Sequence, residues 1–269
     1  MVDIALSLHG QGHTGEITAL SRRGLVPGRH ALGGQWPAFL ANLPTTSPAD
    51  LVRIVRSEIR QAERAVVPWQ RVIDSVRPFV ARIWRGWTEA QKRSFLRHLR
   101  PAWDAVRHRM APGIADRIAD LTASGSLKVL AGRIQGARQT RGDIAVDVKA
   151  GGGRSVALGA RHVINCTGPR SDFATLGMPL IVDARRKRLI RPDPLGLGIE
   201  TESCAAISAD GAESDWLYAV GALTRPVWWE VTAAPEINAQ VLELAATLAN
   251  RAPSTAILAD RFVDLGAGI

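Results

Sequence analysis

Apolar and polar positions in residues 1–45 predict a helix, a turn and a strand. A helix is expected over residues 1–9, and the segment Gly10 to Gly12 that follows is typical of a C-terminal cap, because glycine adopts the left-handed conformation easily. Residues 16–24 predict a buried strand of the parallel-sheet type, closed by a glycine. Helix, short turn and strand in this order predict half of a nucleotide-binding unit.

Residues 46–125 carry the apolar spacing of helices. The first helix begins at Ser47, a good N-cap followed by a proline that suits the first turn. Pro78 is expected to kink the second helix, and Thr88 with Gln91 forms a capping-box signature for the third. The apolar stripes comprise Leu51, Val55, Ile59, Ala62 and Val66; Val72, Ile73, Val76, Phe79, Val80 and Ile83; and Phe95, Leu99, Trp103, Val106 and Met110. Together they predict an inserted helical layer.

The remainder of the chain turns to a pattern of strands. The expected elements are strands over 127–134, 144–148, 154–166 and 215–220, and a helix over 235–250 that begins with a proline. The glycine triplet at 151–153 predicts a hairpin or a tight loop. The sequence therefore predicts an α/β fold, with regions at residues 1–45, 46–125 and 126–252 and a tail at 253–269.

Composition narrows the class of protein. With 46% hydrophobic residues in 269, the chain can bury a substantial core. It has no run of eighteen apolar residues, and no basic segment or small-residue cleavage site follows Met1, so we expect a soluble, cytoplasmic protein. Cys166 and Cys204 lie far apart and the six histidines are scattered, so neither a disulfide framework nor a metal site is predicted.

The net charge of +9 comes mainly from arginine. A positive net charge of this size attracts polyanions and fits a phosphate-bearing ligand. Most of the excess positive charge is explained by an arginine-rich proteome, with the arginines on solvated faces. The third helix is the most basic, with Arg93, Arg97, His98, Arg100, Arg107, His108 and Arg109. This face is either a surface for nucleic acid or an acidic partner, or simply solvated. A solvated face is favoured, because aromatic residues interleave only at core spacing and suit base stacking poorly.

The strand expected over 154–166 leads into Thr167, Gly168 and Pro169. Glycine at such a strand end lets a backbone approach a ligand closely, as cofactor crevices at the carboxyl ends of parallel strands require. A tight turn after a buried strand explains the same residues equally well.

The strand over 215–220 repeats this arrangement in more detail. The residues of this second motif are Gly221, Trp228, Trp229, Glu230, Thr232 and Pro235. The strand ends at the glycine, a loop carries both tryptophans, and the proline opens a helix whose positive end favours an anionic or electron-rich ring. The alternative is that both tryptophans are core residues and the threonine is an N-cap. Two adjacent tryptophans beside a glutamate in a loop favour a binding role over a purely packing role.

Ser21, Arg22 and Arg23 stand at the end of the first expected strand. In a dinucleotide-binding unit an acidic residue at this place binds a ribose 2′-hydroxyl, whereas arginine accommodates the 2′-phosphate of NADP. The alternative is a solvent-facing arginine pair. The position directly after a strand favours NADP.

Two segments carry a family resemblance. Residues 163–169, Val-Ile-Asn-Cys-Thr-Gly-Pro, and residues 217–237, which include Tyr-Ala-Val-Gly-Ala-Leu-Thr-Arg-Pro-Val-Trp-Trp-Glu-Val-Thr-Ala-Ala-Pro-Glu-Ile, resemble bacterial FAD/NAD(P)-binding proteins of uncharacterised function. Those proteins are similar, more remotely, to flavin-containing and lysine/ornithine monooxygenases. The likeness extends over residues 1–252.

The resemblance implies a partial Rossmann-like dinucleotide-binding fold with a helical insertion and a β-rich segment that completes a flavin domain. Family members have two Gly-rich turns, one for the flavin and one for the nicotinamide cofactor. Neither turn stands in this chain, so the resemblance implies a fragment, a truncated gene or a mis-assigned start. The residues placed near the cofactors by analogy are Thr167, Gly168 and Pro169, with Gly221, Trp229, Glu230 and Pro235 toward the flavin.

The function that the resemblance implies is hydride transfer from NADPH to FAD, and then to oxygen or an organic acceptor. The alternatives are a non-catalytic truncated remnant, because the phosphate-gripping turns are missing, and a basic interaction module that binds an acidic partner. The expected partners are FAD, NADP, a small-molecule substrate, and a partner chain that supplies the missing N-terminal segment. No spacing assigns a catalytic residue.

Overall fold

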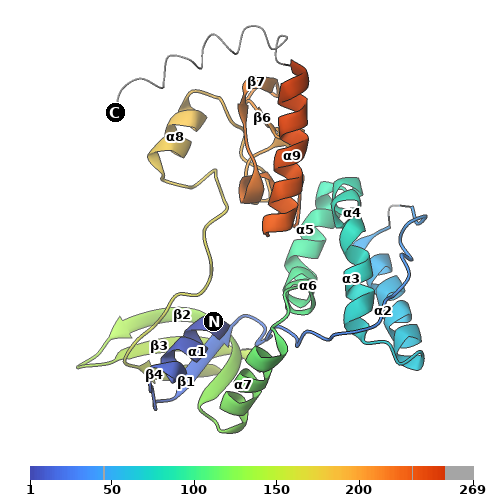
Figure 1. Ribbon diagram of the computed structural model, residues 1–269. Coiled ribbons are helices and arrows are strands. Elements are labelled where there is room, and N and C mark those ends of the chain that lie inside the picture. Colours follow the sequence, from blue (N-terminus) through green and yellow to red (C-terminus); the bar gives the residue numbers. More distant parts are fainter. Residues whose placement is uncertain (45, 232, 252–269) are drawn as a thin grey trace, which may run out of the picture. The chain divides into compact units, whose positions relative to one another are not determined.

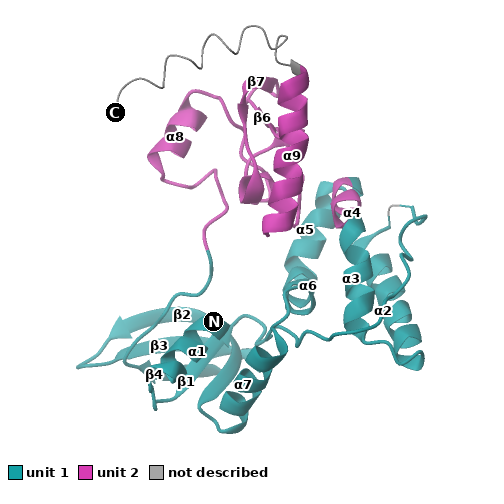
Figure 2. Ribbon diagram, in the orientation of Figure 1, with its two compact units in different colours: residues 1–79, 86–168 teal, residues 80–85, 169–269 magenta. Residues whose placement is uncertain are grey.

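The computed structural model describes residues 1–44, 46–231 and 233–251. The fold is mixed α/β, with a four-stranded mixed sheet and a three-stranded sheet (Figure 1). The chain forms two compact units (Figure 2). Unit 1 comprises Met1–Phe79 and Gly86–Gly168, and unit 2 comprises Val80–Arg85 and the chain from Pro169 onward.

The sheet of unit 1 has the strand order β1-β2-β3-β4. The strands are β1 (Ile17–Ser21), β2 (Leu127–Gln139), β3 (Ile144–Ala150) and β4 (Ser155–Ala160). β1 pairs with β2 in parallel, with Ile17 opposite Leu127, and the other pairs are antiparallel. The parallel pairing of the first strand confirms the sequence prediction. Its burial was overestimated, because the residues of β1 are partly buried or exposed.

Two helices cover one face of the parallel strand pair. They are α1 (Val2–Gly10) and α7 (Pro112–Ala123). Their buried contacts with the sheet are Ala5, Ile118, Leu121 and Leu127, against which Ile17, Ala19 and Val129 pack. The sheet residues of this cluster occupy alternate positions, which place their side chains on the same face. The sequence prediction of a helix over residues 1–9 is confirmed.

The helices between β1 and β2 retain three of the local signals in the sequence, although α7 had no prediction. They are α2 (Pro48–Arg64), α3 (Trp69–Val76), α4 (Val80–Gly86), α5 (Glu89–His98) and α6 (Arg100–Arg107), followed by α7. The Ser47 hydroxyl accepts the Asp50 amide at 3.1 Å, as expected of an N-cap. Both hydrogen bonds of the Thr88–Gln91 capping box are present. Pro78 lies in the 3₁₀ turn η1 (Arg77–Phe79), which separates α3 from α4.

Two predicted elements were too long. The third predicted helix divides at residue 99 into α5 and α6, because Pro101 has no backbone N–H with which to continue the first of them. The strand predicted over 154–166 ends at Ala160, which pairs with Ile144, the first residue of β3. With no further partner strand, residues 161–166 lack regular structure.

Unit 2 contains an antiparallel sheet of order β5-β6-β7. Its elements are α4 without its last residue, α8 (Pro179–Arg186), β5 (Thr201–Glu202), β6 (Ala205–Ile207), β7 (Glu213–Tyr218), η3 (Gly221–Thr224) and α9 (Ala234–Arg251). Ile190, Ile199 and Ala206 form a buried cluster, on which Ile181 and Leu217 pack. The predicted strand over 215–220 and the predicted helix over 235–250 are confirmed as β7 and α9, whereas α8, β5 and β6 had no prediction.

Candidate functional site

The end of β1 presents three polar residues in a tight turn. The Ser21 hydroxyl accepts the Gly24 amide at 2.9 Å and so closes the turn. Gly24 has φ +63°, and a Cβ there would lie 3.2 Å from Ala131 Cβ, so the turn requires glycine. The side chain of Arg23 donates from Nη2 to the carbonyl of Arg97 at 3.1 Å. Arg22 is exposed, at the point where the strand ends.

The N-terminus of α1 lies at the same edge of the sheet as Arg22. Six residues, 11–16, separate α1 from β1, and both elements contribute to one apolar cluster, so the helix and the strand that follows it run in opposite directions. The N-cap Met1 makes no side-chain capping bond, and the first-turn amides carry the positive end of the helix. A positive helix end and an exposed guanidinium therefore share this edge, which we call the nucleotide edge.

The segment with Thr167, Gly168 and Pro169 joins the two units. The backbone N–H and the hydroxyl of Thr167 both donate to Asn165 Oδ1, at 3.0 and 2.7 Å. Gly168 is the last residue of unit 1 and Pro169 the first of unit 2. All three residues are exposed, and residues 161–166, directly before them, do not form a strand. The structure therefore gives the turn interpretation a concrete form, a local Asn–Thr turn.

Gly221 lies in a buried polar network of unit 2. Its N–H donates to Gln240 Oε1 at 2.7 Å. The amide nitrogen of Gln240 donates to the hydroxyl of Thr224 at 2.8 Å, and this hydroxyl donates to the carbonyl of Gly221 at 2.9 Å. Gln240 and Thr224 are both almost completely buried. The N–H of Gly221 is therefore already satisfied within the protein.

Trp229 packs in the core of unit 2. Its ring stacks on Trp84 of α4 with a centroid separation of 4.5 Å, and the guanidinium of Arg225 lies 4.6 Å from its centroid. Trp84 Nε1 donates to the carbonyl of Pro226 at 2.8 Å, which fixes the stack. Trp228 has Arg85 over its ring at 5.0 Å. For Trp229 the structure shows the core arrangement that the sequence left as an alternative.

The remaining residues of the second motif differ in exposure. Glu230 is partly buried, and Pro235 is exposed in the first turn of α9. Thr232 lies outside the described residues. As described, the Gly221 amide and the Trp229 ring do not fit a flavin, because both make intramolecular contacts that a bound ring would have to replace.

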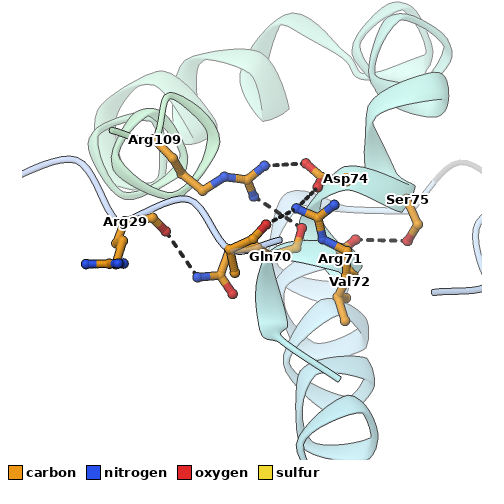
Figure 3. A network of polar contacts seen from close by, with 8 residues as sticks. Arg29, Gln70, Arg71, Val72, Asp74, Ser75 and Arg109 are labelled. Carbon is orange, nitrogen blue, oxygen red and sulfur yellow. Dashed lines mark hydrogen bonds and ion pairs between the residues drawn. The ribbon is translucent and has the colours of Figure 1, made fainter. Parts of the chain in front are cut away.

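A partly buried ion-pair cluster in unit 1 has no counterpart among the predicted sites (Figure 3). Arg109, with 6% of its side chain exposed, donates to Asp74 and to the carbonyl of Gln70. Arg71 donates to the other carboxylate oxygen of Asp74 at 3.0 Å and to the carbonyl of Ala31 at 2.7 Å. The sequence pattern placed Arg109 on a solvated basic face, which is wrong. The cluster instead fastens the segment after β1 onto α3.

One shallow depression on unit 2 is unrelated to these motifs. It has a volume of about 500 Å³ and is lined by Asp172, Ala174, Pro192, Asp193, Pro194, Leu195 and Gly196. The Asp193 carboxylate accepts the amides of Leu195 and Leu197, both at 3.0 Å. This carboxylate therefore serves the local turn.

The sequence matches no protein-family model and no curated protein. Across residues 1–44, 46–231 and 233–251, no helix combines the length and apolar character needed to cross a membrane.

Proposed function

We propose that this chain is part of an NADP- and FAD-dependent oxidoreductase and that the nucleotide edge binds the 2′-phosphate half of NADP(H). The observation that carries the proposal is the placement of exposed Arg22 and the positive end of α1 at one edge of a parallel strand pair. In such an oxidoreductase NADPH gives a hydride to FAD, which then reduces oxygen or an organic acceptor. In this proposal α1 and β1 serve as the second half of a Rossmann-like nucleotide unit.

The chemistry of the edge suits a phosphate group. A guanidinium offers forked donors that match phosphate oxygens, and hydrogen bonds between charged groups are about twice as strong as neutral ones. The free amides at the start of α1 add a second positive contribution. An acidic residue in the place of Arg22 would instead select a ribose hydroxyl. The edge therefore favours NADP over NAD.

The flavin half of the proposal rests on the family resemblance. Thr167, Gly168, Pro169, Glu230 and Pro235 are its remaining candidate residues. Because Gly221 and Trp229 are committed to the core of unit 2, no step of flavin chemistry is assigned to them.

Calorimetry with NADPH and NADH tests the nucleotide edge. We expect NADPH to bind roughly tenfold or more tightly, because one charge-assisted phosphate contact contributes about 1.5–3 kcal/mol. In Arg22→Ala this preference for NADPH should disappear. Arg64→Ala, which removes an exposed arginine at the C-terminal end of α2, is the matched control and should keep the preference. Equal affinities for the two cofactors would contradict the assignment.

The redox part of the proposal has a separate test. The purified chain is incubated with FAD, desalted, and titrated with NADPH under anaerobic conditions. Retained flavin absorbance that bleaches on addition of NADPH supports a working redox site. A colourless protein supports the alternative of a non-catalytic remnant.

One observation favours a second candidate function, the binding of a strand from a partner chain. The Ile17 amide donates to the carbonyl of Ser126, so in a parallel ladder the backbone groups of Thr18 and Leu20 point away from β2. Within the described residues β1 pairs with β2 alone. An edge of this kind accepts an added strand. A basic interaction module is less well supported, because Arg93 and Arg100 pair with acidic residues on their own helices.

A further inference from the structure

Arg23 donates a hydrogen bond at the C-terminal end of α5, where one backbone carbonyl has no N–H donor within the helix. In α5 the carbonyl of Arg97 would accept the N–H of the residue four positions later. That residue is Pro101, which has no N–H. The Arg23 guanidinium supplies the missing donor at 3.1 Å, and its positive charge lies at the negative end of the helix. Arg23, the neighbour of Arg22 at the nucleotide edge, therefore completes the last turn of α5.

Arg23 stands two residues after Ser21, the last residue of β1, and follows Arg22 directly in the sequence. A phosphate bound there would offer Arg23 a charged acceptor in place of a neutral carbonyl. Charge-assisted hydrogen bonds are the stronger kind, and the present bond is exposed, so exchanging one acceptor for the other costs little. We propose that a phosphate group bound at the nucleotide edge accepts the hydrogen bond of the Arg23 guanidinium in place of the Arg97 carbonyl, so that α5 loses its C-terminal cap. We call this exchange of acceptors the switch. This inference rests on the proposed function and adds a response of the helical insertion to nucleotide binding.

The contacts that follow along the chain confine this response to the end of α5. The amide of Gly28 donates to the carbonyl of Ala105, and the amide of Met110 donates to the carbonyl of Gly28, both at 2.8 Å. The Gln70 side-chain amide donates to the carbonyl of Arg29 at 3.1 Å. These bonds involve no residue of the nucleotide edge. The insertion should therefore stay attached while the last turn of α5 frays.

Hydrogen exchange read by mass spectrometry on the full chain tests the switch. The probe is adenosine 2′,5′-bisphosphate, and 5′-AMP, which lacks the 2′-phosphate, is the control ligand. We expect the bisphosphate to raise exchange at amides 95–99 roughly two- to tenfold, which corresponds to the loss of one hydrogen bond. Arg23→Gln should show the same fast exchange without ligand and no further change with it. Exchange in α3 should not change.

The outcomes separate the switch from the proposed function. Calorimetry on the same samples establishes whether the bisphosphate binds. Binding with unchanged or slower exchange at 95–99 overturns the switch and leaves the nucleotide edge in place. Unchanged exchange in ligand-free Arg23→Gln also overturns it, because Arg23 would then not be the cap. Failure to bind the bisphosphate at millimolar concentration overturns the proposed function and the switch together.

Discussion

The nucleotide edge of unit 1 and the Gly221–Trp229 region of unit 2 begin from the same sequence cue, a strand closed by a glycine turn. In unit 1 the turn leaves Arg22 exposed at the edge of the sheet where α1 begins. In unit 2 the turn donates its N–H to Gln240, and the tryptophan that follows is stacked on Trp84. A strand that ends in glycine is therefore compatible with a ligand site or with a core network. What distinguishes the two is whether the polar groups and rings find partners within the protein.

The largest expected effect lies in unit 2. Trp229→Ala removes the stack on Trp84 and the contact with Arg225. We expect a loss of about 3–5 kcal/mol in the free energy of unfolding of unit 2, as for other large buried aromatic residues. Chemical denaturation followed by circular dichroism measures this loss.

Trp216 provides the matched control for this substitution. It is 63% exposed, so Trp216→Ala should change the free energy of unfolding by about 0.5 kcal/mol or less. A similar cost for both substitutions would mean that Trp229 is not a core residue. Trp229→Phe, which retains a ring that can stack, should lose less than Trp229→Ala.

The alkylation rates of the two cysteines provide a comparison between the units. Cys204 is buried in unit 2, where burial raises the pKa of its thiol and the nearby Glu243 carboxylate adds to the effect, whereas Cys166 is exposed in unit 1. At pH 8 we expect iodoacetamide to modify Cys204 at least about a hundredfold more slowly, equivalent to about 2.7 kcal/mol. Peptide mapping after timed quenching measures both rates. Equal rates would contradict the burial of Cys204.

The raised pKa of Cys204 also sets the sign of a pH effect. The thiol holds its proton more tightly in the folded state than in the unfolded state. Its contribution to stability is therefore present below the ordinary thiol pKa and is lost as the pH rises through the folded-state pKa. In Cys204→Ser this loss at alkaline pH should be absent from denaturation curves.

At the nucleotide edge, substitution of Asp3 should have the weakest effect that we predict. Asp3 stands in the first turn of α1, where its carboxylate opposes a phosphate at the same helix end. Asp3→Asn should tighten NADPH binding about two- to fivefold, corresponding to about 0.3–1 kcal/mol. Asp120→Asn, an exposed acid late in α7, is the control and should leave the affinity unchanged. Weaker NADPH binding by Asp3→Asn would place the phosphate elsewhere.

Local signals predicted much of the fold. The cap at Ser47, the capping box at Thr88 and the break at Pro78 depend on residues within four positions of one another, and all three are present. The end of β4 was not predictable in this way. It is set by where its partner β3 begins, at Ile144, and not by the apolar residues that continue along the chain.

The candidate site shows the same limit over longer distances. The position of Arg22 and Arg23 after a strand was readable, but their different surroundings depend on a contact between Arg23 and Arg97. Arg109 appears in the sequence as one of several arginines on a helix, and only its contacts with Gln70 and Asp74 show that it is buried. Similarly, the partner of Trp229 is Trp84, far earlier in the chain.

The most direct test of the central claim is the ratio of NADPH affinity to NADH affinity, measured by calorimetry on Arg22→Ala and on Trp229→Phe. If Arg22 recognises the 2′-phosphate and Trp229 serves the core of unit 2, the ratio falls to about one in Arg22→Ala and keeps its wild-type value in Trp229→Phe. An unchanged ratio in Arg22→Ala, or a ratio that collapses in Trp229→Phe, would contradict this division of roles between the two regions.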